Sequence, residues 1–146
     1  MNARMKTTEP AVESVSSGKD VGLLENIKNG SMSSTQLMTN VQELESIGEF
    51  RAACNLFALW LDSYKGGHRH IFLYNYGSSL QKDKNFNEAV VAYKSSIKLC
   101  PEFSQAYINL GLLYEKIGNQ LAALQIWLHL IDRRGTKKPP ESEFVI

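Results

Sequence analysis

The sequence contains only two cysteines, and it shows no cluster of residues with the spacing needed to hold a metal ion. The two cysteines, Cys54 and Cys100, lie far apart and belong to no CxxC pair. Neither groups with the histidines, so the spacing predicts no metal site and no cofactor. We expect two small thiols in a reducing compartment and not a disulfide. The run His68-Arg69-His70 lacks a third ligand, and it therefore indicates a polar loop between helices.

An excess of charge of either sign is also missing. Lys and Arg number 16, Asp and Glu number 15, and the formal net charge is +1. A surface this neutral does not attract phosphate over a long range, so we expect no nucleic-acid partner. A basic cluster near the C-terminus has two interpretations, a solvated helix end and a contact for an acidic partner. It consists of Arg133, Arg134, Lys137 and Lys138.

Long hydrophobic runs are absent. No stretch reaches about eighteen consecutive apolar residues, so we expect no helix that spans a membrane. The basic start, residues 1–6, is followed by Thr7-Thr8-Glu9-Pro10 in place of an apolar run, which argues against a secretory signal. We therefore expect a cytoplasmic protein.

Proline and strand patterns are rare across the middle of the chain. Pro101 is the sole proline between Ser34 and Arg133, and no alternating apolar pattern competes there with helical spacing. Ser33 and Gln36 have the spacing of a capping box, which predicts that a helix starts there. The middle of the chain is therefore expected to be entirely α-helical.

The two ends differ from this middle. Residues 1–33 are expected to form a flexible tail with one short helix at 20–29, capped by Asp20 and ended by Gly30. Ten residues do not form a stable helix alone in water, so this helix would need something to dock on. Residues 136–146 contain Pro139-Pro140, and we expect a tail or linker there.

A repeat with a period of 34 residues organises the middle of the chain. At this offset, Leu73-Tyr74-Asn75-Tyr76-Gly77 aligns with Tyr107-Ile108-Asn109-Leu110-Gly111. A weaker, earlier copy lies 36 residues before the middle one, because two residues are inserted near 66–69. Tandem copies of this length indicate helix pairs that must stack to bury their apolar faces. The same offset of 34 pairs Leu80 with Tyr114, Ala89 with Ala123, and Tyr93 with Trp127.

This pattern resembles the tetratricopeptide repeat family, whose unit is two antiparallel helices. The resemblance implies a right-handed α-solenoid of about three units, near 34–67, 70–103 and 104–135. The first unit is degenerate, because Asn40 and Val41 stand where the family has Leu-Gly. We expect Gly77 and Gly111 to let paired helices approach closely. A left-handed backbone is expected at the turns, at Gly48 and Gly118 and, with more strain, at Lys84.

The family holds extended peptides in a concave groove, and the resemblance implies a similar groove here. Asn75 and Asn109 occupy matching places in it, and a side-chain amide both donates to and accepts from a peptide backbone. This pair is similar to the asparagine arrays of O-linked N-acetylglucosamine transferases and related bacterial repeat proteins. The alternative is that asparagine fits there for structural reasons. The expected groove residues are Met38, Gln42, Ile71, Tyr74, Asn75, Ser78, Lys82, Gln105, Ile108, Asn109, Leu112 and Lys116.

One known mode of the family does not fit. Repeat domains that grip the acidic tails of chaperones use lysines, asparagines and an arginine across the groove. Of the corresponding positions in this chain, only Asn75 agrees with that pattern. We therefore do not expect this chain to clamp a terminal carboxylate.

No catalytic motif accompanies the repeat, and we expect a protein that is not an enzyme by itself. Glu43 and Glu45 lie two positions apart on a helix, so they point to different faces. Three functions stay open. They are a module that binds a protein or peptide, the N-terminal recognition region of a larger glycosyltransferase, and an array that self-associates through its uncapped end. A weaker option is that Phe144-Val145-Ile146 docks in a PDZ-type groove.

Overall fold

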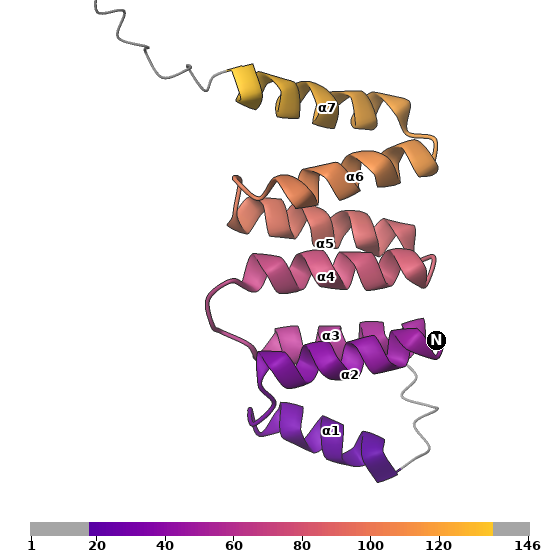
Figure 1. The fold of residues 1–146 in the computed structure, drawn as a ribbon, viewed down its shortest axis with the longest axis vertical. Helices are drawn as coiled ribbons and strands as arrows, with labels where there is room; N and C mark the ends of the chain where they lie inside the picture. The colour runs from indigo at the N-terminus through magenta and orange to yellow at the C-terminus, as the bar shows by residue number, and fades with distance from the viewer. Residues whose placement is uncertain (1–17, 136–146) are drawn as a thin grey trace, which may run out of the picture.

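The chain forms a stack of helices. The computed structural model describes residues 18–135, and within this range all regular structure is α-helical (Figure 1). The predicted tails at 1–17 and 136–146 lie outside the described residues. The helices are α1 (Gly18–Lys28), α2 (Ser34–Ser46), α3 (Phe50–Ser63), α4 (Arg69–Lys82), α5 (Phe86–Leu99), α6 (Ser104–Lys116) and α7 (Gln120–Gly135).

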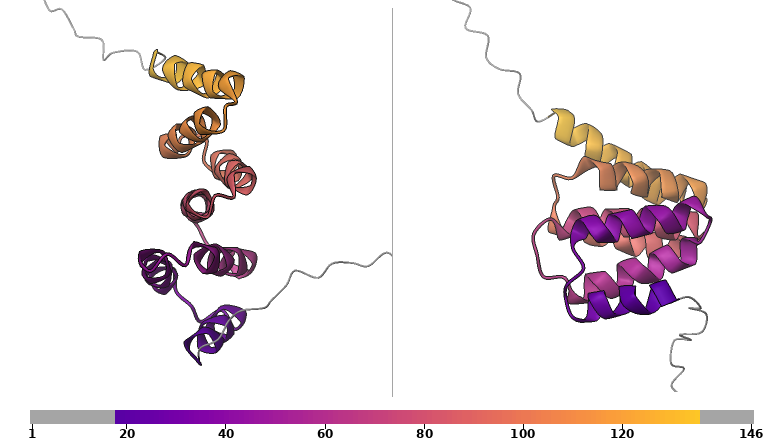
Figure 2. Two further views of the ribbon diagram at one scale, coloured as in Figure 1. Left: turned by 90° about the vertical axis from the view of Figure 1, so that its right-hand side faces the viewer. Right: turned by 60° about the horizontal axis from the view of Figure 1, so that its bottom comes forward.

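Each helix from α2 onward packs against the next one along the chain, up to α7. The stack therefore grows in chain order along the long axis of the molecule (Figure 1). Seen nearly along the helix axes, α2, α4 and α6 lie on one side of the stack, and α3 and α5 lie on the other (Figure 2). This arrangement confirms the predicted all-α helical repeat solenoid.

Local sequence signals set the ends of several helices. The Ser33 hydroxyl accepts from the Gln36 amide N–H at 3.2 Å, and the Gln36 side chain accepts from the Ser33 N–H at 2.8 Å. This is the predicted capping box, and α2 begins directly after it. The predicted left-handed turn residues are also found: φ is +83° at Gly48, +61° at Lys84 and +79° at Gly118. Lys84 adopts this backbone although its Cβ disfavours it, because the repeat geometry requires the turn.

The short N-terminal helix forms, with different bounds from those expected. It begins at Gly18, so Asp20 lies within the helix and does not cap it, and residues 18–19 belong to α1 and not to the predicted tail. Gly30, with φ of +71°, follows its end as predicted. The helix packs on α3, and Ile27 is 4% exposed in the first core. α1 therefore covers the N-terminal end of the stack.

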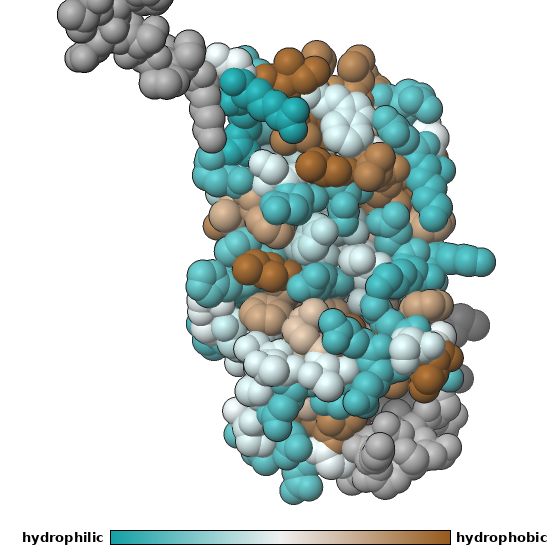
Figure 3. Space-filling model, in the orientation of Figure 1, coloured by the Kyte–Doolittle hydropathy of each residue, from teal (hydrophilic) through white to brown (hydrophobic). Residues whose placement is uncertain are grey.

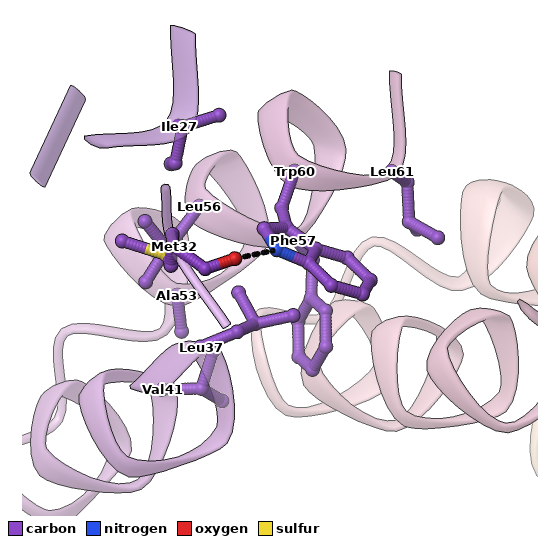
Figure 4. Packing of buried hydrophobic residues seen from close by; sticks show 9 residues of the cluster. All are labelled: Ile27, Met32, Leu37, Val41, Ala53, Leu56, Phe57, Trp60 and Leu61. Carbon is purple, nitrogen blue, oxygen red and sulfur yellow. Dashed lines mark hydrogen bonds between the residues drawn. The ribbon is translucent and has the colours of Figure 1, made fainter. Parts of the chain in front are cut away.

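Trp60 links α1, α2 and α3 at the N-terminal end of the stack. Its indole N–H donates to the Met32 carbonyl oxygen at 3.2 Å, which ties the connection between α1 and α2 to α3 (Figure 4). The first core surrounds Trp60, and a second core lies between α3, α4, α5, α6 and α7. The first core consists of Ile27, Met32, Leu37, Val41, Ala53, Leu56, Phe57, Trp60 and Leu61.

Two glycines make room for aromatic rings. A Cβ on Gly77 would lie 2.8 Å from Cε1 of Tyr93, and a Cβ on Gly111 would lie 2.6 Å from Cζ2 of Trp127. The sequence predicted close approach of paired helices at these glycines. In the structure, the space beside each glycine is filled by the aromatic side chain of the paired helix. The second and third helix pairs therefore share a glycine–ring contact, whereas the first pair has Val41 at the matching position.

The predicted insertion lies in the connection between α3 and α4, residues 64–68. His68 has a left-handed backbone with φ of +58°, and the Arg69 guanidinium donates to the carbonyl oxygens of Leu61 and Tyr64 at 2.6 Å each. Arg69 thus satisfies carbonyl groups at the end of α3. Within residues 18–135, no group of three or more His, Cys, Asp or Glu side chains is placed to hold a metal ion.

Candidate functional site

The predicted groove residues lie on α2, α4 and α6, the helices on one side of the stack; we call this side the groove face. It is turned toward the viewer in Figure 3, where apolar and polar side chains alternate over it. Three aliphatic side chains stay open to solvent here: Ile71 and Ile108 are each 37% exposed, and Leu112 is 50% exposed. Of the predicted residues, Gln42, Ile71, Lys82, Gln105, Ile108, Leu112 and Lys116 are exposed, and Met38, Tyr74, Asn75, Ser78 and Asn109 are half-buried.

A cavity of about 300 Å³ opens on the groove face between α4 and α6, with α5 behind it. The structure brings five predicted residues together around it: Ser78, Lys82, Asn109, Leu112 and Lys116. Gln81 and Tyr93 also line it, and the sequence did not indicate either as a site residue. The other predicted residues lie outside this lining: Met38, Gln42, Ile71, Tyr74, Asn75, Gln105 and Ile108.

A chain of polar contacts forms one wall of the cavity. The Asn109 amide donates to the Tyr93 hydroxyl at 3.4 Å, and that hydroxyl donates to the Gln81 side-chain oxygen at 3.1 Å. Burial raises the pKa of Tyr93, so the hydroxyl keeps its proton at neutral pH and remains a donor. The repeat alignment placed Tyr93 in the core by its ring. That its hydroxyl reaches the cavity depends on the spacing of α4, α5 and α6.

The two lysines of the cavity differ in their surroundings. Lys82 forms an ion pair with the Glu45 carboxylate, which also accepts from the Ser79 hydroxyl at 2.6 Å. The Lys116 ammonium lies 5.0 Å from the centre of the Phe86 ring, and it forms no ion pair with another residue in the range 18–135. Lys116 therefore brings a positive charge to the cavity rim that no neighbouring carboxylate neutralises.

The two matching asparagines also differ. The Asn109 amide donates to Tyr93, whereas within residues 18–135 the Asn75 amide has a hydrogen bond only to the Met38 sulfur, at 3.9 Å. The residue that corresponds to Tyr93 in the first unit is Phe57, which has no hydroxyl to offer Asn75. Thioether sulfur is a weak acceptor. Asn75 is therefore the asparagine with more hydrogen-bonding capacity left for a ligand.

Tyr74 contributes less to the groove face than the sequence predicted. Its ring packs edge-on against Phe103, with centroids 5.2 Å apart, and lies 5.9 Å from the Tyr93 ring. These contacts place the ring between α4, α5 and the connection before α6. Tyr74 therefore supports the packing of the second and third helix pairs more than it offers free apolar surface.

The cysteines do not lie at this site. Cys54 is buried, and burial raises the pKa of its thiol to about 12. At neutral pH it stays protonated, which is the unreactive form of cysteine. Both cysteines are free thiols, as the sequence predicted. The groups that meet at the cavity are amides, hydroxyls, ammonium groups and an aliphatic side chain, a set suited to hold a polar chain by hydrogen bonds.

A family model described as TPR repeat matches residues 77–118, from the middle of α4 to the turn after α6. This match includes the second half of α4, all of α5 and all of α6, which are the helices around the cavity, and it supports the tetratricopeptide resemblance. A comparison with curated proteins found no match. None of the helices within residues 18–135 has both the length and the apolar character needed to cross a membrane.

Proposed function

We propose that residues 34–135 form a non-catalytic interaction module of three helix pairs, near 34–67, 70–103 and 104–135, which binds an extended peptide or a partner helix on its groove face. The TPR repeat match supports an interaction module in general, since such repeats stack into concave binding surfaces. The free thiols Cys54 and Cys100 agree with a reducing compartment, and we propose the cytoplasm.

The observation that carries this proposal is the cavity on the groove face. Its wall offers donors and acceptors from Asn109, Gln81 and Ser78, and Leu112 and the nearby Ile108 offer apolar surface. An extended peptide needs both, because its backbone must exchange hydrogen bonds with water for new ones while its side chains bury apolar area. Asn75, one unit earlier, would continue the same contacts along the peptide.

The asparagines give this proposal its test. We expect Asn75→Ala to weaken binding of a peptide selected from a random displayed library by roughly tenfold, the equivalent of one lost hydrogen bond of about 1.4 kcal/mol. Asn109→Ala should weaken peptide binding less, because the Asn109 amide already donates one hydrogen bond to the Tyr93 hydroxyl. The dissociation constants are measured by isothermal titration calorimetry.

Asn87→Ala is the matched control, because Asn87 is an exposed asparagine on α5, away from the groove helices. It should leave the affinity unchanged. Equal affinities for the wild type, Asn75→Ala and Asn109→Ala would show that the asparagines are structural, and failure to select any peptide would count against the groove itself.

A second candidate function is the substrate-recognition region of a larger glycosyltransferase. The matching positions of Asn75 and Asn109 on α4 and α6 support it, since a regular asparagine spacing suits a long peptide substrate. Sequencing the gene beyond the codon for Ile146 tests it. A reading frame that continues into a catalytic domain would favour this candidate, and an immediate stop codon would exclude it.

A further inference from the structure

The outer face of α7 carries four large apolar side chains that no other helix within residues 18–135 covers. Leu121, Leu124, Leu128 and Ile131 are 68, 52, 56 and 65% exposed. The residues of α7 that pack on the second core, among them Ala123, lie on the opposite face. Figure 3 shows apolar side chains gathered at the end of the molecule that α7 forms. We call these four residues the α7 stripe.

Comparison with α5 shows that the α7 stripe has more apolar side chains than the packing of a following helix would need. At the 34-residue offset, Leu124 and Ile131 correspond to positions of α5 that are half-buried against the second core. Leu121 and Leu128 correspond instead to Asn87 and Lys94, which are exposed. α7 thus has two leucines where the preceding repeat keeps polar residues. An excess of this kind marks a contact surface of a different type from the repeat stacking.

The spacing of the stripe is symmetric. Leu121 and Ile131 lie five positions on either side of residue 126, and Leu124 and Leu128 lie two positions on either side. An antiparallel second α7 would therefore place Leu121 opposite Ile131 and Leu124 opposite Leu128. Contacts between identical copies across a two-fold axis require such self-complementarity. Steps of three and four residues are also those of apolar seams between packed helices.

The charges of α7 favour the antiparallel arrangement. Its charged side chains, Asp132, Arg133 and Arg134, all lie in the last turn. Arg133 is paired with Glu102, and a parallel pair would set the remaining charged residues, Asp132 and Arg134, beside their own copies. An antiparallel pair sets this turn beside Gln120 and the first turn of the other copy, which carries no charge, and it also opposes the two helix dipoles.

At the other end of the stack, residues 22–28 of α1 offer no matching surface. Among these residues no large apolar side chain is exposed: Leu23 and Ile27 pack in the first core, and Leu24 is half-buried. Stacking of one copy's α7 on this segment of another copy's α1 would therefore leave the stripe against the exposed side chains of Glu25, Asn26 and Lys28. A contact between two α7 helices buries apolar surface on both sides.

We infer that two copies of this chain associate through the α7 stripe, as a two-fold symmetric, antiparallel pair of α7 helices. Four side chains on one helix cover less than the roughly 800 Å² that each partner contributes to a standard interface, so the dimer is weak and depends on concentration. It presents two groove faces, which raises the avidity for a ligand with two binding segments. That last consequence rests on the proposed function; the dimer itself does not.

Sedimentation velocity of the full chain tests the dimer over about 10 μM to 1 mM, a range that brackets weak association. The wild type should shift from monomer toward dimer. The double variant Leu121→Asn with Leu128→Lys carries the residues that α5 has at the same positions, so it should fold and remain monomeric. Val91→Gln is the control: Val91 is 62% exposed on α5, and α7 has Gln125 at the matching position, so the dimer should persist.

Two results would overturn the inference: a wild type that stays monomeric at every concentration, or a double variant that dimerises as the wild type does. Circular dichroism verifies folding, and Leu128→Lys alone replaces the double variant if that one is unfolded. The orientation is read from an equal mixture of Gln120→Cys and Asp132→Cys chains, each with Cys100→Ser. Disulfides between the two different variants support the antiparallel pair, and disulfides within each variant exclude it.

Discussion

Replacing Gly77 with leucine is expected to lower the free energy of unfolding by about 3 kcal/mol. The first added atom, Cβ, would lie 2.8 Å from the Tyr93 ring, and that ring is fully buried at 0% exposure. The ring cannot move aside without opening the second core or breaking its hydroxyl contacts with Gln81 and Asn109. Chemical denaturation followed by circular dichroism measures the loss.

Two further glycines give the comparison its controls. Gly111→Leu makes the same kind of clash with Trp127, but that ring is half-buried and can swing toward solvent, so a smaller loss of about 2 kcal/mol is expected. Gly22 lies in α1 with no atom near its missing Cβ, and Gly22→Leu should change stability by less than about 1 kcal/mol. If Gly77→Leu lowered the free energy of unfolding no more than Gly22→Leu does, the glycine–ring contact would not hold the helix pair together.

Truncation of Trp60 to alanine is expected to cost about 3 to 5 kcal/mol, the range for a large buried aromatic residue. Trp60 is 3% exposed, and its ring centre lies 4.0 Å from that of Tyr64 and 4.6 Å from that of Phe72. Alanine would leave a cavity between α3 and α4 that the surrounding helices cannot fill. The midpoint and slope of urea denaturation report this loss.

A milder change separates packing from hydrogen bonding at the same residue. Trp60→Phe keeps an aromatic ring but leaves the Met32 carbonyl oxygen without its indole donor, at a cost of about 1 to 2 kcal/mol. Amide hydrogen exchange in α1 should speed up more than exchange in α5, since Met32 follows α1 in the chain. Leu59→Ala, at a neighbouring residue that is 44% exposed, serves as the control. Uniform exchange across all helices would show that Trp60 does not anchor α1.

Local signals allowed much of the fold to be predicted. The capping box at Ser33 and the left-handed turns at Gly48 and Gly118 depend on residues close together in the chain, and the structure has them where they were expected. The start of α1 was missed because Asp20 has the chemistry of a cap but lies inside the helix. Residue preference at a helix end is weak, and packing on α3 decides where this short helix forms.

The candidate site could be predicted only in part. The first-helix periodicity found Ser78, Lys82, Asn109, Leu112 and Lys116, which the fold brings to one cavity. It missed Tyr93 because an aromatic residue at a repeat position indicates core packing, and the ring is indeed buried. Its hydroxyl lies at the cavity only because α5 passes behind α4 and α6. The peptide-binding role of these residues remains a proposal.

The sequence by itself determined the repeat: its period, its helix pairs and the glycines within them, because each is a relation between residues at a regular spacing. The tertiary structure alone decided which polar groups stay available. Asn75 and Asn109 occupy equivalent repeat positions, yet Asn109 donates to the Tyr93 hydroxyl, and among the described residues Asn75 donates only to the Met38 thioether. The exposure of the α7 stripe also depends on the tertiary structure, because no other helix within residues 18–135 covers these four side chains. Hydrogen bonding and burial depend on what packs against a residue from elsewhere in the chain, and a repeat pattern does not contain that information.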